Sequence, residues 1–357
     1  MRHLAPWRLT WRSSLLVTLW SALLLPTTAT AQVSADSVTA WTRTMQVGPT
    51  LAARDAALAK LASLSAATLP AETRRVLVAE LNRVHLALKA GTAIGAAGED
   101  EGAFSDYYTT LVLVVAAIET PEAALALVPA VAVSGGVARQ VAQRGDTAVA
   151  LLVQQLLSAS QPDEHAALLE SLGLAWFWAD STGSPLSDRS RAQIVAALTA
   201  AGLSGAHDDM IGIQAALEKI RDPGFLPLAQ RVYDFAATRG VLGRSTVVTM
   251  EDNVIPPLTA LAASRSPASL ASGLARMVTA VCGTDATGRR NGACQSLTND
   301  VAAASKHLTN GQTTPARNGF ESVAKKIAKA YADGAFSDAE HALLAGNVAM
   351  VLQRLAP

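Results

Sequence analysis

The sequence predicts an all-α protein, and three observations support this fold class. Half of the 357 residues are hydrophobic, yet only 4% are aromatic, and alanine dominates the apolar share. Small side chains on this scale suit closely packed helices better than sheets, which favour β-branched and aromatic residues. Apolar residues also recur at helical spacing, and no alternating run is long enough to support a strand; "STVVTM" at Ser245–Met250 is a weak exception.

The first 31 residues read as a secretory signal peptide. Three arginines form a basic start, residues 13–25 form an apolar segment, and Ala29-Thr-Ala31 matches the small-residue pattern that a signal peptidase cleaves. The apolar segment is shorter than the about 20 residues that span a bilayer, so a retained membrane anchor is the less favoured alternative. We therefore expect an exported protein, periplasmic or secreted, whose mature chain begins near Gln32.

Loss of the leader makes the chain weakly acidic. The full sequence has 29 basic and 29 acidic residues, and the leader removes three arginines, so the formal charge becomes 26 − 29 = −3. Nucleic-acid binding needs a basic stripe and is not expected. The densest cationic spot, Lys325, Lys326 and Lys329, has helical spacing and indicates a solvated helix face rather than an anion site.

The two cysteines favour a structural disulfide. Cys282 and Cys294 flank "GTDATGRRNGA", a predicted loop, and disulfides persist in the compartments that exported proteins reach. A metal or redox pair is the alternative, but the spacing is not C-x-x-C and no histidine is near in sequence.

Apolar stripes and capping residues mark individual helices. Leu77, Leu81, Val84 and Leu88 predict one helix over 71–90. The same spacing recurs at Val149, Leu152, Val153 and Leu156 and at Leu344, Val348, Val351 and Leu355. Helix starts are predicted at Thr120-Pro121 and Asp222-Pro223, and at the Ser337–Glu340 capping box.

The pentapeptide "GAFSD" occurs twice, at Gly102–Asp106 and at Gly334–Asp338. Glycine can end one helix and serine can begin the next, so both copies are predicted to be helix-turn-helix corners rather than a shared site. The acidic triplet Glu99–Glu101 beside the first copy offers oxygen ligands for Ca²⁺. Because it lacks the spacing of a known calcium loop, a solvated acidic turn is favoured.

Turn-plus-helix units that recur without strands suggest stacked helical hairpins. The openings at Gly145-Asp146 and Asp222-Pro223 lie 77 residues apart, close to two 40–47-residue HEAT periods. Residues 32–266 thus resemble an irregular HEAT or armadillo α-solenoid. The resemblance implies an extended stack of repeats whose concave or convex face binds other molecules.

Residues 267–357 read as two related hairpins, with serine-led helices expected at Ser296 and Ser337. The stretch "AAASKHLTNGQTTPARNGFESVAKKIAKAYADGAFSDAEHALL" makes this four-helix C-terminal unit similar to the FIMAH domain, a small helical module at the ends of exported bacterial proteins. The resemblance implies no catalytic residues. The segment between Cys282 and Cys294 departs from that module.

The apolar run at 109–138 raises the question of a membrane span. Glu119 and Glu122 interrupt it, and Thr120-Pro121 restarts a helix in its middle. Two buried helices therefore explain the run better than a membrane-spanning helix, and we expect no stable span in the mature chain.

Catalytic and cofactor motifs are missing from the sequence. No metalloprotease, nucleophile-elbow, Walker or dinucleotide pattern occurs, and the five histidines beyond the leader lie far apart. The one local cluster, His207-Asp208-Asp209, precedes an apolar helix, so Asp208 or Asp209 is interpreted as its N-cap. No cofactor, metal or catalytic residue is expected, although a site assembled from distant residues stays open.

Two tryptophans, Trp176 and Trp178, suggest where a partner could bind on the surface. Trp176 shares an apolar helical stripe and is expected in the core, whereas Trp178 lies on another face, near Phe177. Packing of Trp178 against a neighbouring repeat is favoured, and a role of Trp178 and Phe177 as partner anchors is the alternative. The sequence favours an exported scaffold that binds a protein or cell-envelope component; self-assembly and an enzyme with a dispersed site are the other classes.

Overall fold

The computed structural model describes residues 33–90, 92, 94, 101–131, 135–159, 161–240, 243–283 and 288–356. This part of the chain is all-α, with no strand. The helices are α1 (Ala35–Val47), α2 (Leu51–Ala62), α3 (Ala71–Ala90), α4 (Glu101–Ala116), α5 (Pro121–Leu127), α6 (Gly135–Ala142), α7 (Asp146–Ser158), α8 (Pro162–Thr182), α9 (Asp188–Ser204), α10 (His207–Leu217), α11 (Leu226–Ala237), α12 (Arg244–Thr249), α13 (Ile255–Ser264), α14 (Pro267–Cys282), α15 (Gly288–Thr309), α16 (Thr313–Ala332) and α17 (Asp338–Arg354). Short 3₁₀ turns occupy η1 (Val128–Ala130) and η2 (Pro223–Phe225), and a π-helical turn occupies η3 (Met250–Val254). The predicted signal peptide lies outside the described residues, as do the acidic residues Glu99 and Asp100 and the side chain of Glu101.

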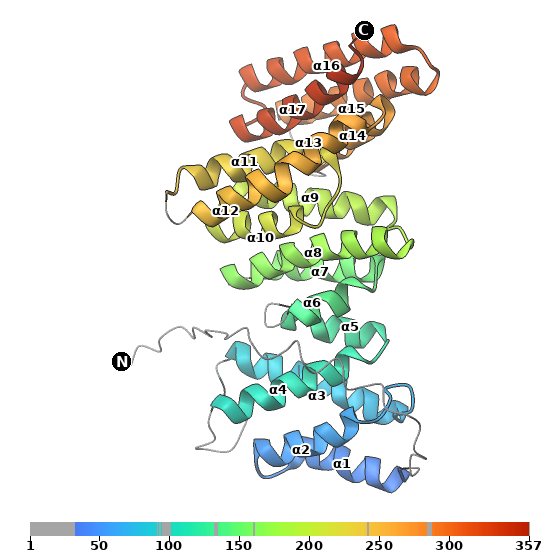
Figure 1. The fold of residues 1–357 in the computed structure, drawn as a ribbon, viewed down its shortest axis with the longest axis vertical. Helices are drawn as coiled ribbons and strands as arrows, with labels where there is room; N and C mark the ends of the chain where they lie inside the picture. Colours follow the sequence, from blue (N-terminus) through green and yellow to red (C-terminus); the bar gives the residue numbers. More distant parts are fainter. Residues whose placement is uncertain are drawn as a thin grey trace.

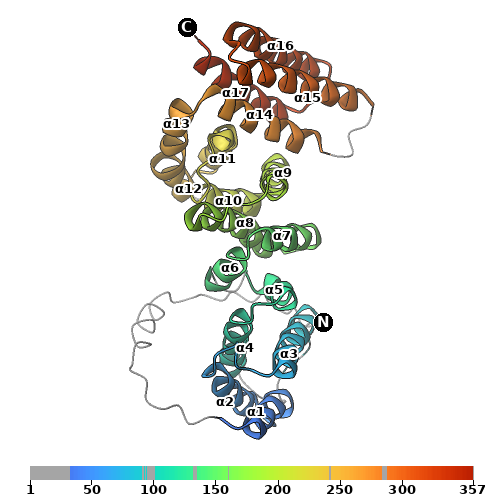
Figure 2. The same cartoon turned by 90° about the vertical axis from the view of Figure 1, so that its right-hand side faces the viewer.

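The helices stack along one long axis, from α1 and α2 at one end to α15, α16 and α17 at the other (Figures 1 and 2). One cluster of buried apolar side chains runs from Val38 to Leu355 and crosses residues 266 and 267 without a break. The all-α prediction is confirmed, and the arrangement is compatible with a helical solenoid.

Glycines bring α8 and α10 into close contact. A Cβ atom on Gly173 would lie 2.5 Å from the Cα of Ala216, and one on Gly212 would lie 2.6 Å from the carbonyl oxygen of Ala166. Ala166 and Gly212 meet near the starts of the two helices, and Gly173 and Ala216 meet farther along both. Small side chains are therefore needed at both places where α8 and α10 touch. The abundance of small residues thus serves close helix packing, as the composition predicts.

Several predicted helix signals are confirmed. The stripe helix spans Ala71–Ala90 as expected, with Leu77, Leu81 and Val84 fully buried, although Leu88 is 46% exposed at its far end. Thr120 accepts from the backbone N–H of Ala123 and caps α5. The other two starts also form: Asp222 caps η2, and Ser337 with Glu340 makes a complete capping box on α17.

The two "GAFSD" copies differ, so the prediction of two corners is wrong for the first. Gly334 has φ +71° after α16, and Ser337 caps α17, which makes the second copy a corner. The first copy lies inside α4. There Phe104 stacks on Tyr108 one helical turn later, with ring centroids 5.9 Å apart. Helix α4 begins one residue before the pentapeptide and includes it, which places part of Phe104 against this neighbour.

Two further expectations are corrected. Helix α15 already begins at Gly288, so the predicted loop between the cysteines is shorter and Ser296 lies mid-helix, where its hydroxyl accepts from Lys326 (2.9 Å). The weak strand candidate "STVVTM" is helical, as α12 and the start of η3. Pro256 and Pro257 follow directly in α13; because they lack N–H donors, carbonyls of the preceding turn lose their usual partners, which fits a π turn there.

The run at 109–138 contains α4, α5 and η1 and the start of α6, and residues 132–134 of it are not described. Most of its leucines and valines are buried in the common core. In the described part of the chain, no helix combines the length and apolar character needed to cross a membrane.

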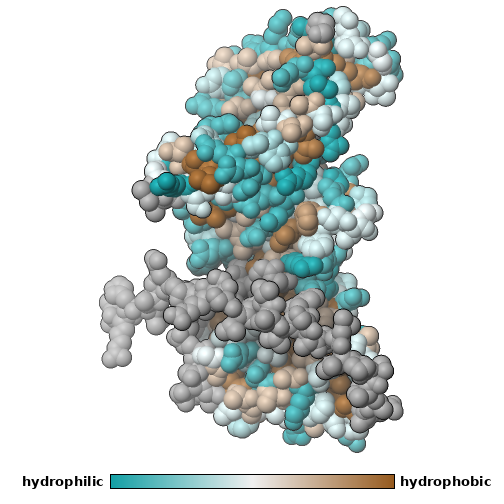
Figure 3. Space-filling view, viewed as in Figure 1, coloured by the Kyte–Doolittle hydropathy of each residue, from teal (hydrophilic) through white to brown (hydrophobic). Residues whose placement is uncertain are grey.

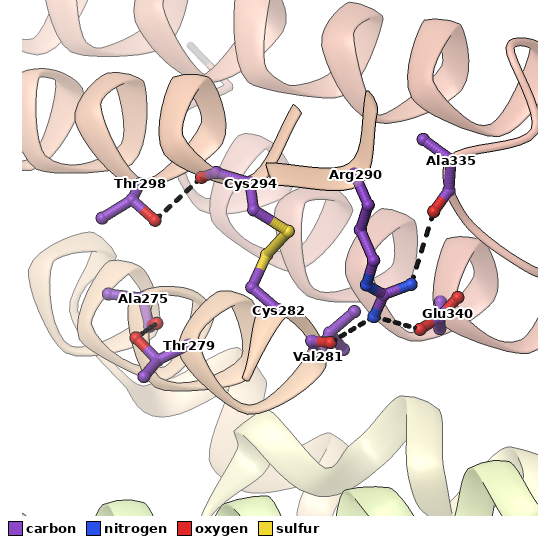
Figure 4. The surroundings of a disulfide bond; sticks show 9 residues. All are labelled: Ala275, Thr279, Val281, Cys282, Arg290, Cys294, Thr298, Ala335 and Glu340. Carbon is purple, nitrogen blue, oxygen red and sulfur yellow. Dashed lines mark hydrogen bonds and ion pairs between the residues drawn. A yellow bond between two sulfur atoms is a disulfide. The ribbon is translucent and has the colours of Figure 1, made fainter. Parts of the chain in front are cut away.

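A disulfide joins Cys282 at the end of α14 to Cys294 in α15, as predicted (Figure 4). Beside it, Arg290 donates to the carbonyl oxygens of Val281 (2.5 Å) and Ala335 (3.3 Å) and to Glu340 Oε1 (2.6 Å). One guanidinium therefore ties the end of α14 to the α16–α17 turn and to the capping box of α17.

The last four helices also contact the preceding stack directly. Asn347 of α17 is 2% exposed and donates to the carbonyl oxygen of Gly224 in η2 (3.1 Å). Arg276 of α14 pairs with Asp222 (2.5 Å), and Thr199 of α9 donates to the sulfur of Met277 (3.4 Å). This contact mixes polar pairs with the shared apolar core.

Candidate functional site

The aromatic segment of α8 divides its side chains between the core and the surface. Trp176 is buried and meets Phe225 edge to face, with ring centroids 5.8 Å apart. The guanidinium of Arg191 from α9 lies 4.7 Å from the Trp176 ring. The expectation that Trp176 is a core residue is confirmed.

Trp178 lies at the boundary between core and surface. Its ring is half-buried and packs against the core cluster, and the guanidinium of Arg139 on α6 lies 4.5 Å from the ring centroid. Within the described part of the chain, its buried Nε1 has no hydrogen-bond partner. Trp178 therefore packs against the core and against Arg139 of the neighbouring helix α6, in line with the favoured interpretation.

Phe177 is the exposed member of the segment. It is 40% exposed and meets Trp178 edge to face at 5.6 Å. We call Phe177, Trp178 and Arg139 the Trp178 surface. An exposed aromatic ring beside a second ring and an arginine combines the residue types that are enriched in binding hot spots.

Exposed apolar residues are scattered over the face of the molecule drawn in Figure 3. On the face drawn in Figure 3, apolar residues form small patches separated by hydrophilic ones. Such scattered patches are ordinary for a monomer surface, so exposed apolar area alone does not single out a site.

A second cluster joins residues that are distant in sequence. The Nδ1 atom of His165 in α8 donates to Asp209 Oδ1 of α10 (2.5 Å), and Ser204 Oγ donates to Asp209 Oδ2 (2.7 Å). The N-cap interpretation is therefore wrong for both Asp208 and Asp209. The N-cap position of α10 is Ala206, which has no side-chain cap. Asp209 is instead buried as the partner of His165 and Ser204.

This His-Asp-Ser cluster does not have the connectivity of a catalytic triad. In a triad the serine hydroxyl bonds to histidine, whereas Ser204 bonds to the carboxylate and also accepts from the backbone N–H of Ala206 (3.2 Å). The arrangement holds α8, α9 and α10 in register, and it leaves the serine without a base to activate it.

The other histidines are dispersed. His85 shares a hydrogen bond with Tyr108 (2.8 Å), and His207 lies near Phe235 with ring centroids 6.3 Å apart. His307 donates to Gln312 (2.6 Å), and His341 stacks on Tyr331. Within the described ranges, no three His, Cys, Asp or Glu side chains form a group that could hold a metal ion.

A buried polar network links α3 and α4. Glu80 accepts from Tyr107 (2.7 Å) and from both Nε and Nη2 of Arg83 (2.8 and 2.6 Å). Nearby, burial lowers the pKa of His85 to about 4 and raises the pKa of Tyr108. His85 Nδ1 has no hydrogen-bond partner among the described residues, so a neutral imidazole is the form that this site accommodates.

The predicted cationic face of α16 is partly paired. Lys326 forms an ion pair with Asp300 of α15, and Lys329 pairs with Asp333 at 3.1 Å. Lys325 has no ion-pair partner among the described residues. These pairs fit the interpretation of a surface helix face.

The chain matches no known protein family, no curated protein and no solved structure in the three comparisons made. Sequence reasoning identified Trp178 and Phe177 but missed the contacts of Arg139 and the His165–Asp209 pair. The 44-residue separation of that pair, close to one HEAT period, is the signal that could have found it.

Proposed function

We propose that this protein is an exported, HEAT-like helical-repeat scaffold that binds another protein or a cell-envelope component and performs no catalysis. The observation that carries the proposal is the Trp178 surface on an elongated helical stack. Stacked repeats present extended surfaces for partners, and rigid aromatic rings are effective anchors on such surfaces.

Export is part of the proposal and has its own support. The leader pattern of residues 1–31 and the Cys282–Cys294 disulfide both suit a protein that leaves the reducing cytoplasm. Within this proposal, residues 267–357 act as a FIMAH-like unit that helps in attachment or assembly.

The choice of anchor follows from burial. Phe177 can leave water on binding, because 40% of it is exposed. Trp178 is held by Arg139 and the core, so it supports the ring of Phe177 rather than moving. Loss of Phe177 should therefore weaken binding without unfolding the protein, whereas loss of Trp178 would also leave a cavity.

The test is capture of partners from cell-envelope extract by three forms of the full chain. The forms are the wild type, Phe177→Ala, and Leu157→Ala as a matched control, since Leu157 of α7 is 86% exposed. We expect one identified species that the wild type and Leu157→Ala retain and that Phe177→Ala loses. Equal capture by all three forms contradicts the Trp178 surface, and self-association without capture favours a self-assembling protein instead.

A further inference from the structure

A hollow of about 420 Å³ opens between α5, the end of α4 and the corner that joins α6 to α7. We call it the α5 pocket. Its volume falls within the range of about 300–1,000 Å³ that is typical of small-molecule sites. It is independent of the Trp178 surface, because neither Phe177, Trp178 nor Arg139 lines it.

The positive group of the α5 pocket is Arg144. Its Nη1 donates to the carbonyl oxygen of Thr120 (3.0 Å), and its Nη2 donates to those of Ala116 (3.4 Å) and Ile118 (2.9 Å). A guanidinium has five N–H donors, so three are used and two remain, one on Nη1 and one on Nε. Within the described part of the chain these two donors have no acceptor. The backbone therefore holds the guanidinium in place while part of its hydrogen-bonding capacity stays free.

The negative group is Glu119, which lies in the turn between α4 and α5 and also lines the pocket. Burial lowers the pKa of Arg144, and the charge of Glu119 opposes that shift, so the two charges lie close enough to interact. Among the described residues, Glu119 forms neither an ion pair nor a side-chain hydrogen bond. The pocket thus presents one fixed cation and one unpaired anion.

The rest of the lining supplies hydrogen bonds and a small apolar wall. Gln140, Gln143 and Thr147 line the pocket, and their side chains have no hydrogen-bond partner in the described ranges. Amide and hydroxyl groups of this kind can both donate and accept. Ala117 and Pro121 are exposed and provide a small apolar surface that suits a short side chain.

Another hollow in the described part of the chain contains charged groups that are already paired. It lies between the start of α16 and the end of α17 and has a volume of about 410 Å³. There Arg317 is paired with Glu321 (3.1 Å), and Arg354 donates to the carbonyl oxygen of Arg265 (3.4 Å). Its charged groups already have partners within the protein, so it does not require a charged ligand.

We propose that the α5 pocket binds a small zwitterion of the amino-acid or dipeptide class. The ligand carboxylate accepts from one of the free N–H groups of Arg144, and the ligand ammonium pairs with Glu119. In a dipeptide, Gln140 and Gln143 bond to the peptide group, and a small apolar side chain lies against Pro121. A ligand with only one of the two charges leaves the other pocket charge unmatched.

Isothermal titration calorimetry on the full chain tests this with alanyl-alanine as the probe. N-acetyl-alanyl-alanine, which lacks the ammonium, and alanyl-alanine amide, which lacks the carboxylate, are the matched probes. We expect alanyl-alanine to bind and each capped probe to bind about tenfold more weakly, the size of one lost charge-assisted bond. Absence of alanyl-alanine binding, or equal affinity for the capped probes, overturns the proposal.

Two variants locate the binding. Glu119→Gln should weaken alanyl-alanine about tenfold and should leave the N-acetylated probe unaffected, since that probe has no ammonium to lose. Glu122→Gln is the control, because Glu122 is an exposed residue of α5 that does not line the pocket. Equal losses in both variants contradict the assignment.

Arg144 itself is a poor position for substitution, because its removal would expose three carbonyl groups and could unfold α4. The side-chain amide signals of Gln140 and Gln143 provide a second readout in NMR spectra of the wild type. They should shift as alanyl-alanine is added, and unchanged signals at saturating probe overturn the proposal.

Discussion

The last four helices and the middle of the stack are held together differently. In α14–α17, a disulfide and the side chain of Arg290 join segments that meet at one corner (Figure 4). Between α8 and α10, Gly173 and Gly212 allow the two backbones to approach closely, because neither residue has a Cβ atom. This corner of the C-terminal unit is therefore held by covalent and polar links, and the α8–α10 contact by close approach of the two backbones.

The regions also differ in how they use buried polar groups. At α3 and α4, Glu80, Tyr107 and Arg83 form a buried network, and His85 nearby is held neutral. In the C-terminal unit, burial would raise the pKa of Glu340, but Arg290 and Ser337 lower it overall. Acid should consequently weaken the two regions over different pH ranges.

Removal of the disulfide should have the largest effect on stability. We expect the double variant Cys282→Ser, Cys294→Ser to lose about 3 kcal/mol, the chain-entropy value for a closed loop of this size. Denaturant unfolding monitored by circular dichroism measures the loss. An unchanged midpoint would show that Arg290 alone is enough to hold this corner.

Gly173→Ala should have the next largest effect, about 2 kcal/mol of destabilisation. The new Cβ would lie 2.5 Å from the backbone of α10, so the helices must move apart. Gly292→Ala is the matched control, since a Cβ atom on that glycine of α15 would have no neighbouring atom within 4 Å.

The control should gain about 0.5–1 kcal/mol, because alanine favours helix more than glycine does. Both variants are compared by thermal unfolding. Similar effects at the two positions would remove the proposed difference between the regions.

Acid should affect α3 and α4 before it affects the C-terminal unit. The pKa of His85 is about 4 in the folded protein against an ordinary 6.5, so the unfolded chain binds more protons between these values. The stabilisation is complete above pH 6.5 and is lost as pH falls toward 4, with about 1 kcal/mol lost at pH 5.5.

Glu340 shows the other pattern, since its pKa is lowered from 4.5. The contribution of Glu340 to the free energy of unfolding is complete above pH 4.5. It is lost only as the pH falls through the lower pKa that Glu340 has in the folded protein. Hydrogen exchange of α3–α4 and α14–α17, measured from pH 7 to pH 4, compares the two regions. His85→Gln should reduce the pH dependence of α3–α4, and an unchanged dependence would assign it to another group.

The smallest effect is expected on the surface of α16. Lys329→Ala removes an ion pair whose two side chains are largely exposed, so stability should stay within about 0.5 kcal/mol of the wild type. Chemical denaturation checks this value. A larger loss would show that the helix surface contributes to the C-terminal unit in a way that its contacts do not explain.

Several local signals in the sequence predicted local structure correctly. Thr120, Asp222 and Ser337 each form the predicted cap, because capping depends on residues within one turn. The disulfide between Cys282 and Cys294 was predicted from the short segment that separates them and from the expected export of the chain. The prediction for the first "GAFSD" copy was wrong because packing of Phe104 on Tyr108 favours helix there. The pentapeptide is the same in both places, so residues outside it determine the difference.

The sequence by itself determined the all-α class, several helix starts and the disulfide, since these follow from periodicity, capping and composition. The tertiary structure decided which distant residues meet. His165 reaches Asp209 across 44 positions, Arg139 covers Trp178, and Arg144 reaches the carbonyl groups at the end of α4. Such contacts depend on how successive helices are rotated and stacked, and the short-range spacing of residues does not contain that information.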